Sequence, residues 1–240
     1  RVSIENMNSI RYLFLPIIAL IAPLLLVATQ PDLGTSILIA AGGIIVAWLA
    51  GVRIKFFVYS SIAFLSLLPV AISFLKPYQK SRILTFLNPE RDPLGAGYQI
   101  IQSKIAIGSG GLFGKGFLNG SQSYLDYLPE KHTDFIFTLF SEEFGFFGSL
   151  SILLLYALII SRIVKIGTLT RSTFGKLYCY SFATAFFIYV VVNMMMVLGL
   201  LPIVGSPLPI MSYGGSSMMA IMFGLGIVMS CKIHKDTPVN

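Results

Sequence analysis

Acidic side chains are concentrated in the stretch LPEKHTDFIF, which contains Glu130 and Asp134 and closely follows Asp126. Asp134 stands immediately before the apolar run FIFTLF, where a polar loop would enter an apolar layer. Partial loss of water raises the proton affinity of a carboxylate at such a boundary and suits it to act as a general base. Thr133 or Asp134 would equally suit the N-cap of the following helix. The residues alone leave catalysis and helix capping equally open.

A glycine-rich stretch at residues 108–116, GSGGLFGKG, could hold phosphate. It departs from the P-loop pattern, which requires Gly where Ser109 stands and Ser or Thr where Gly116 stands. Backbone amides together with Lys115 could still form a nest for the phosphates of a lipid headgroup. A flexible turn is the simpler interpretation of the same glycines.

Polar residues also occur inside the apolar stretches of the second half. Glu142 and Glu143 follow Asp134 by eight and nine residues. Such a pair is more typical of ion partners inside a helical bundle than of catalytic groups. Asn193, within YVVVNMMMVLG, predicts a hydrogen-bond donor between helices.

No metal site made of protein side chains is predicted. His132 and His234 are too far apart in the expected topology to share a metal ion. Cys179 and Cys231 lie in apolar sequence, which indicates small buried side chains rather than a disulfide framework or a thiolate site.

The amino-acid composition indicates whether water or lipid surrounds the protein. Of the 240 residues, 55% are hydrophobic and 11% are charged, and the mean hydropathy is +0.82. Water-soluble domains carry about a quarter charged residues. A chain this poor in charge therefore requires lipid around it. The net charge of +7 is attributed to Lys and Arg that fix topology and contact anionic membrane lipids, and no feature predicts nucleic-acid binding.

The predicted fold is an all-α polytopic membrane protein, a single integral membrane domain over residues 1–240. A bilayer core about 30 Å thick is crossed by roughly 20 apolar residues. One long extracytoplasmic loop, residues 76–134, is expected between the third and fourth of six transmembrane helices. Asp32 is expected to cap the second helix. The six predicted spans are residues 12–29, 33–50, 56–75, 144–164, 177–200 and 217–233.

The distribution of Lys and Arg predicts the orientation. Basic residues occur at both ends and at alternate connections, whereas residues 30–32 and 201–216 contain none. The positive-inside rule then places both ends in the cytoplasm and the long loop outside. Within that loop, residues 98–107 have apolar positions at helical spacing and are expected to lie on or dip into the membrane surface. Residues 201–215, LPIVGSPLPIMSYGG, are apolar but rich in Pro and Gly, and we interpret them as a lid or wall beside the long loop.

Four motifs together resemble one family of proteins. They are QPDLGTS (residues 30–36), NPERDPLGAGYQIIQSKIAIGSGGLFGKG (88–116), LPEKHTDFIF and PLPIMSYGGSS (207–217). The sequence closely resembles the SEDS family, the shape, elongation, division and sporulation proteins, and IQSKIAIGSGG is most similar to its RodA branch. Family members have more spans than this chain, which matches their later part. Because the sequence begins at Arg1, we expect a piece of a longer protein or a truncated form.

The resemblance implies a peptidoglycan glycosyltransferase of the bacterial cytoplasmic (inner) membrane. It would polymerise lipid II for cell elongation and rod shape, together with a class B penicillin-binding protein, and would need no organic cofactor. Asp134, the Asp of the HTDF motif, is then expected to act as general base while undecaprenyl pyrophosphate leaves. The pyrophosphate charge would be offset by Lys104, Lys115 or Lys131, or by a divalent cation such as Mg²⁺ or Mn²⁺. Glu130 is a further candidate for substrate binding.

Two other functions remain open at this point. A lipid II flippase predicts ionisable residues along a path across the whole bilayer, and the expected spans hold almost none. A non-catalytic scaffold that activates a penicillin-binding protein predicts that Asp134 can be replaced without loss of activity.

Overall fold

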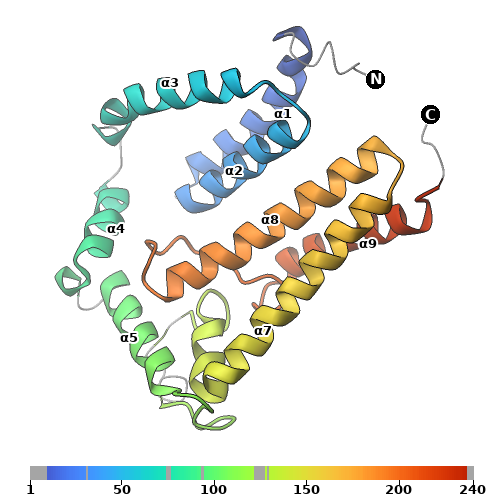
Figure 1. Cartoon of the computed structure of the whole chain (residues 1–240). Helices are drawn as coiled ribbons and strands as arrows, with labels where there is room; N and C mark the ends of the chain where they lie inside the picture. The colour runs from blue at the N-terminus through green and yellow to red at the C-terminus, as the bar shows by residue number, and fades with distance from the viewer. Residues whose placement is uncertain are drawn as a thin grey trace. The chain divides into compact units, whose positions relative to one another are not determined.

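The computed structural model describes residues 10–30, 32–73, 77–92, 95–121, 128 and 130–236, and this part of the chain contains helices and no strand (Figure 1). The elements are α1 (Ile10–Thr29), α2 (Leu33–Leu49), α3 (Ile54–Ser73), α4 (Pro77–Leu87), a 3-10 turn η2 (Pro89–Arg91), α5 (Ala96–Ser109), α7 (Ile136–Leu169), α8 (Thr173–Val197) and α9 (Gly215–Ile233). The predicted all-α class is confirmed. The expected long loop contains helices α4 and α5.

Helices α7, α8 and α9 are long and apolar enough to cross a membrane. Three shorter apolar helical stretches precede them, Pro16–Thr29, Gly34–Leu49 and Ile54–Leu67. The polytopic membrane class is therefore supported, while the count of six spans and the topology of the loop stay predictions.

The chain divides into two compact units, residues 1–81 and residues 82–240, so the single domain over 1–240 stays a prediction. In the first unit, α1 and α2 pack together. Asp32 caps α2, because its Oδ1 accepts from the backbone N–H of Thr35 at 3.0 Å and its Oδ2 accepts from the Thr35 hydroxyl at 2.6 Å. The predicted cap is confirmed.

In the second unit, α5 packs against α7 and α8. Its buried positions are Gly97, Ile100, Ser103 and Ala106, which recur every three residues and form one helical face. Ser103 is fully buried, and its hydroxyl donates to the carbonyl of Val197 at 2.7 Å. The helical spacing seen in residues 98–107 is thus confirmed, and the position of α5 at the membrane surface stays a prediction.

Helix α7 begins earlier than the predicted span at residues 144–164, because a kinked first section precedes the apolar run. Gly145 lies at the kink with φ 66° and ψ −159°, a conformation that glycine tolerates best. The backbone N–H groups of Phe146 and Phe147 donate to the carbonyls of Gly111 and Leu112 at 2.9 and 3.2 Å. Residues 110–121, here called the glycine-rich loop, thus replace the hydrogen bonds that the kink removes from the helix.

Side by side, α7 and α8 form the centre of the second unit, and α9 packs on both (Figure 1). Their apolar core includes Tyr156, Phe186 and Val197, and it continues into Leu208 of the connection between α8 and α9. This connection is bound to the core by the Tyr156 hydroxyl, which donates to the carbonyl of Pro209 at 2.6 Å.

Candidate functional site

Residues 130–135, here called the acidic turn, lead directly into α7. The backbone N–H groups of Thr133 and Phe135 both donate to the carbonyl of Glu130 at 3.2 Å. The Thr133 hydroxyl donates to Oε2 of Glu130 at 2.9 Å. Phe135 is only 1% exposed and occupies the N-cap position of α7, and its own side chain makes no capping hydrogen bond. The N-cap position predicted for Thr133 or Asp134 is thus occupied by Phe135.

Asn193, a fully buried residue of α8, holds the backbone of the acidic turn in place. Its Nδ2 donates to the carbonyl of Asp134 at 2.8 Å and to the carbonyl of Ser206 at 2.7 Å. Asn193 is a hydrogen-bond donor, as predicted. Its acceptors lie in the turn before α7 and in the connection between α8 and α9, and not on a neighbouring helix. One amide thus fixes two segments that lie 59 and 13 residues away in the sequence.

Residues 201–214, here called the proline-rich segment, lie against the acidic turn. The Ser212 hydroxyl donates to the carbonyl of Thr133 at 2.6 Å and accepts from the backbone N–H of Leu208 at 2.7 Å. The backbone N–H of Tyr213 donates to the carbonyl of His132 at 2.9 Å. The expected wall beside the end of the long loop is confirmed by these hydrogen bonds.

The Asp134 side chain is half-buried and faces the proline-rich segment. A Cβ atom on Gly205 would lie 3.5 Å from Asp134 Oδ2, and Gly205 has a φ of +74°. A Cβ there would make ordinary van der Waals contact with the carboxylate, so it is the positive φ that favours glycine at this position. The carboxylate stands where the acidic turn gives way to the apolar residues of α7.

An open apolar cavity of about 640 Å³ lies next to the acidic turn. Its walls come from the turn, the start of α7, the proline-rich segment and the start of α9, and they include His132, Ile136, Ile210, Tyr213 and Met218. Asp134 is not among the residues that line it. The cavity offers apolar surface beside the polar turn.

The other predicted substrate-binding residues lie in different surroundings. Glu130 is exposed and Lys131 is half-buried on the same turn as Asp134. Lys104 is exposed on α5, and its side chain lies over Gly199, so close that a Cβ there would overlap Lys104 Cε. The structure thus brings Glu130 and Lys131 to the Asp134 turn and places Lys104 beside the end of α8.

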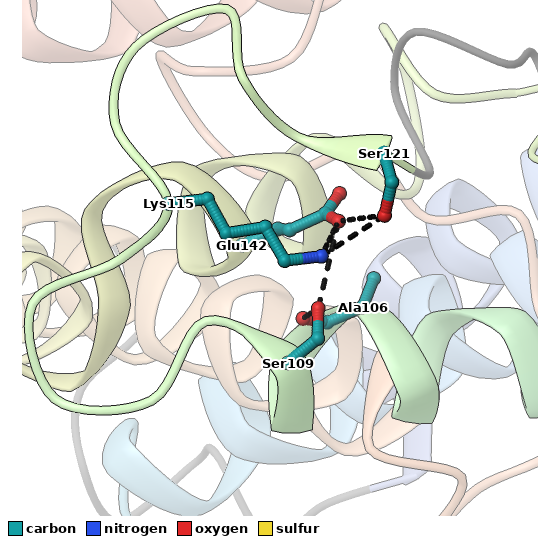
Figure 2. Close-up of polar contacts among 5 residues, drawn as sticks. All are labelled: Ala106, Ser109, Lys115, Ser121 and Glu142. Atoms are coloured by element: carbon teal, nitrogen blue, oxygen red, sulfur yellow. Dashed lines mark hydrogen bonds and ion pairs between the residues drawn. The ribbon is translucent and has the colours of Figure 1, made fainter.

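Lys115 belongs to a second polar cluster, shown in Figure 2. Its Nζ lies 2.7 Å from Oε1 of Glu142, which is fully buried, whereas the Lys115 side chain is 30% exposed. The Ser121 hydroxyl donates to the same Oε1 at 3.0 Å, and the Ser109 hydroxyl lies 3.5 Å from it (Figure 2). The interpretation of Glu142 as a structural ion partner is confirmed.

The glycine-rich loop uses its amides within the protein. The backbone N–H groups of Lys115 and Gly116 donate to the carbonyls of Glu142 and Glu143, both at 3.0 Å. The backbone N–H of Gly114 donates to the carbonyl of Gly110 at 2.8 Å. These contacts agree with the structural turn and leave the phosphate nest as an untested alternative.

The described residues contain no group of three or more His, Cys, Asp or Glu side chains that could hold a metal ion. Asp126, the third acidic residue noted in the sequence, lies outside the described residues. The divalent cation expected from the resemblance therefore stays a prediction, and the chemistry below is argued from the side chains.

The family model FTSW_RODA_SPOVE, described as "Cell cycle protein", matches residues 3–237. The chain belongs to this family. Among members of the FtsW/RodA/SpoVE family, the peptidoglycan glycosyltransferase MrdB of Escherichia coli (strain K12) is 49% identical over 220 residues, which are 91% of this chain and 60% of that protein. The peptidoglycan glycosyltransferase RodA of Treponema pallidum (strain Nichols) is 48% identical over 165 residues, which are 69% of this chain and 38% of that protein.

The fold agrees with the family assignment. A solved structure described as "Structural coordination of polymerization and crosslinking by a peptidoglycan synthase complex" superposes with a TM-score of 0.77 and 34% identity. The alignment covers 96% of this chain and 64% of that chain. The chain thus spans about three fifths of the length of MrdB, and the resemblance to SEDS proteins noted from the four motifs is confirmed.

Sequence reasoning missed several residues that hold the site together. Ser212 and Tyr156 each bind a backbone carbonyl in a distant segment, and the sequence around them gave no signal beyond a polar group in an apolar stretch. Such a group predicts a partner, because buried polar atoms are normally hydrogen-bonded. It does not say which segment supplies that partner.

Proposed function

We propose that this chain is part of a peptidoglycan glycosyltransferase that polymerises lipid II for cell elongation, with Asp134 as the general base. The names of the relatives support the activity. The observation that carries the assignment to Asp134 is the anchoring of its backbone carbonyl by the buried Asn193. A catalytic carboxylate must be held in position, and this turn is fixed by hydrogen bonds to α8 and to the proline-rich segment.

The proposed reaction is an inverting glycosyl transfer. Asp134 accepts the proton from the 4-hydroxyl of the acceptor's N-acetylglucosamine as that oxygen attacks the anomeric carbon of the growing chain's N-acetylmuramic acid. The new carbon–oxygen bond forms as the bond to the pyrophosphate oxygen breaks, and undecaprenyl pyrophosphate leaves. The half-buried carboxylate keeps part of its surface exposed, where a substrate hydroxyl can reach it.

The leaving pyrophosphate needs positive charge near it. Lys131 on the acidic turn and Lys104 on α5 are proposed to supply it, with Glu130 binding a sugar hydroxyl. Lys115 would have to leave Glu142 to take part, because the two form an ion pair at 2.7 Å. The apolar cavity beside the turn would receive part of the undecaprenyl chain. The divalent cation expected from the resemblance stays a prediction.

The setting of the reaction is part of the same proposal. The chain would lie in the bacterial inner membrane with both ends in the cytoplasm and the acidic turn outside. A class B penicillin-binding protein is proposed as partner, which is supported by the likeness to a structure whose description joins polymerization and crosslinking. The polymer would then be made next to the enzyme that crosslinks it.

Polymerisation of lipid II by the full-length protein with its penicillin-binding partner tests the proposal. Asp134→Asn should abolish the glycan product while the complex stays intact, because the amide cannot take the proton. Glu143→Gln is the matched control: it removes an acidic charge nine residues further along, from a residue that contacts the glycine-rich loop through its backbone carbonyl and not through its side chain. Equal polymerisation by Asp134→Asn and the native protein would rule out Asp134 as base and favour a scaffold. Lipid II movement across vesicles without any polymer would favour a transporter.

A further inference from the structure

The ends of α7 and α9 form a cavity of about 430 Å³ that is far along α7 from the acidic turn. Its walls carry four basic side chains and three apolar ones, namely Arg162, Lys165, Lys232 and Lys235 with Ile166, Leu169 and Met229. The volume falls within the range of about 300–1,000 Å³ that is typical of small-molecule sites. The four basic side chains therefore share one concave site and are not scattered over the surface.

Helix geometry explains why the charges gather there. Arg162, Lys165, Ile166 and Leu169 follow the spacing i, i+3, i+4 and i+7, so they share one face of α7. Lys232 lies in the last turn of α9. The two helix ends are tied together, because the backbone N–H of Arg171 donates to the carbonyl of Lys235 at 3.1 Å.

The four basic side chains of the cavity are not neutralised by nearby acids. Residues 144–235 contain neither Asp nor Glu. Asp236, the acid that follows this stretch, lies 4.0 Å from Arg171, which is outside the cavity. Over the described residues, none of the four basic side chains makes a hydrogen bond or an ion pair. Setting the topology or balancing the helix dipole requires basic residues near the helix ends, but it does not require a shared concave face with an apolar floor.

We propose that this cavity binds the headgroup of an anionic phospholipid. The basic side chains would contact the phosphate and the rest of its negative headgroup, which suits Lys and Arg at a membrane surface. The exposed apolar side chains of Leu169 and Met229 would contact the start of an acyl chain. The lipid would be a resident of the leaflet in which α7 and α9 end, and it would couple the two helix ends. An acidic peptide would complement the positive charge of the cavity, but it would not account for the apolar side chains that line the cavity between two membrane helices.

Lipid binding to the full-length protein in detergent, measured by native mass spectrometry, tests the proposal. Dioleoylphosphatidylglycerol should bind at least about tenfold more tightly than dioleoylphosphatidylcholine, since each basic residue near an anionic headgroup contributes about 1 kcal/mol. Arg162→Gln with Lys232→Gln should weaken phosphatidylglycerol binding about 30-fold by the same reasoning. Lys55→Gln with Lys176→Gln removes two exposed basic residues that do not line the cavity and should leave binding unchanged.

A second variant distinguishes binding that requires the shape of the cavity from binding that requires only its positive charge. Met229→Trp keeps all four basic residues but fills the cavity, and it should also lose phosphatidylglycerol binding. Unchanged binding in Met229→Trp would overturn the proposal, as would equal affinity for the two lipids or equal effects of the two double substitutions. Preference for a soluble oligoglutamate peptide over phosphatidylglycerol would likewise overturn it and assign the cavity to a protein partner.

Discussion

Replacing Lys115 with Met should destabilise the protein by about 3 kcal/mol, because it leaves the buried Glu142 carboxylate without its cation. Removal of one partner of a buried ion pair costs about 3–5 kcal/mol. The Lys115 side chain is 30% exposed, which places this pair at the lower end of that range. The hydroxyl of Ser121, 3.0 Å from Oε1 of Glu142, stays but cannot neutralise the charge.

The substitution of Glu142 by Gln should cost less, about 1–2 kcal/mol. The neutral amide oxygen can still accept from Ser121, and Lys115 can turn toward water because its side chain is partly exposed. The double variant with Lys115→Met and Glu142→Gln should be more stable than Lys115→Met alone, since it no longer holds a buried carboxylate from which the Lys115 charge has been removed.

The assay is thermal unfolding of the purified full-length protein in detergent, combined with amide hydrogen exchange. At roughly 2–4 °C per kcal/mol, Lys115→Met should lower the midpoint by roughly 6–12 °C. The amides of Lys115 and Gly116 should exchange faster, because they donate to the carbonyls next to the broken pair. Lys176→Met is the matched control at an exposed position and should change stability by less than about 0.5 kcal/mol. The reasoning is refuted if Lys115→Met is no more harmful than Lys176→Met, or if the double variant is as unstable as the two single effects added together.

Two further substitutions test how the site is held. Asn193→Asp should cost about 3 kcal/mol and suppress polymerisation, because a carboxylate repels the carbonyls of Asp134 and Ser206 that the amide now binds; unfolding midpoints and lipid II assays check this, and an active, stable variant would contradict it. Gly145→Ala should cost at least about 1–2 kcal/mol for the positive φ and should accelerate hydrogen exchange across the glycine-rich loop. Gly226→Ala, where a Cβ meets nothing within 4 Å, is its control, and equal midpoints for the two alanine variants would disprove the role of the kink.

Local patterns predicted the parts of the fold that depend on neighbours in the sequence. The apolar runs predicted the bounds of helices α8 and α9 to within a few residues, because the length and hydrophobicity of a membrane helix depend on consecutive residues. The cap at Asp32 was predictable for the same reason, since its acceptor and donor lie three residues apart. The first section of α7, which precedes the predicted span at 144–164, was not predicted, because the kink at Gly145 is stabilised by the glycine-rich loop and not by its own helix.

By itself the sequence indicated the membrane class and most of the apolar helices, and the resemblance of its motifs indicated the family and the candidate base, Asp134. The tertiary structure decided what holds that base: the amide of Asn193, 59 residues along the chain, and the hydroxyl of Ser212, 79 residues beyond Thr133. It also decided that Lys115 pairs with Glu142 across 27 residues. Helical periodicity reports which face a side chain occupies, whereas the partner on the opposite face depends on how the helices pack. A buried polar group in a sequence therefore predicts that a partner exists, and packing decides which residue that partner is.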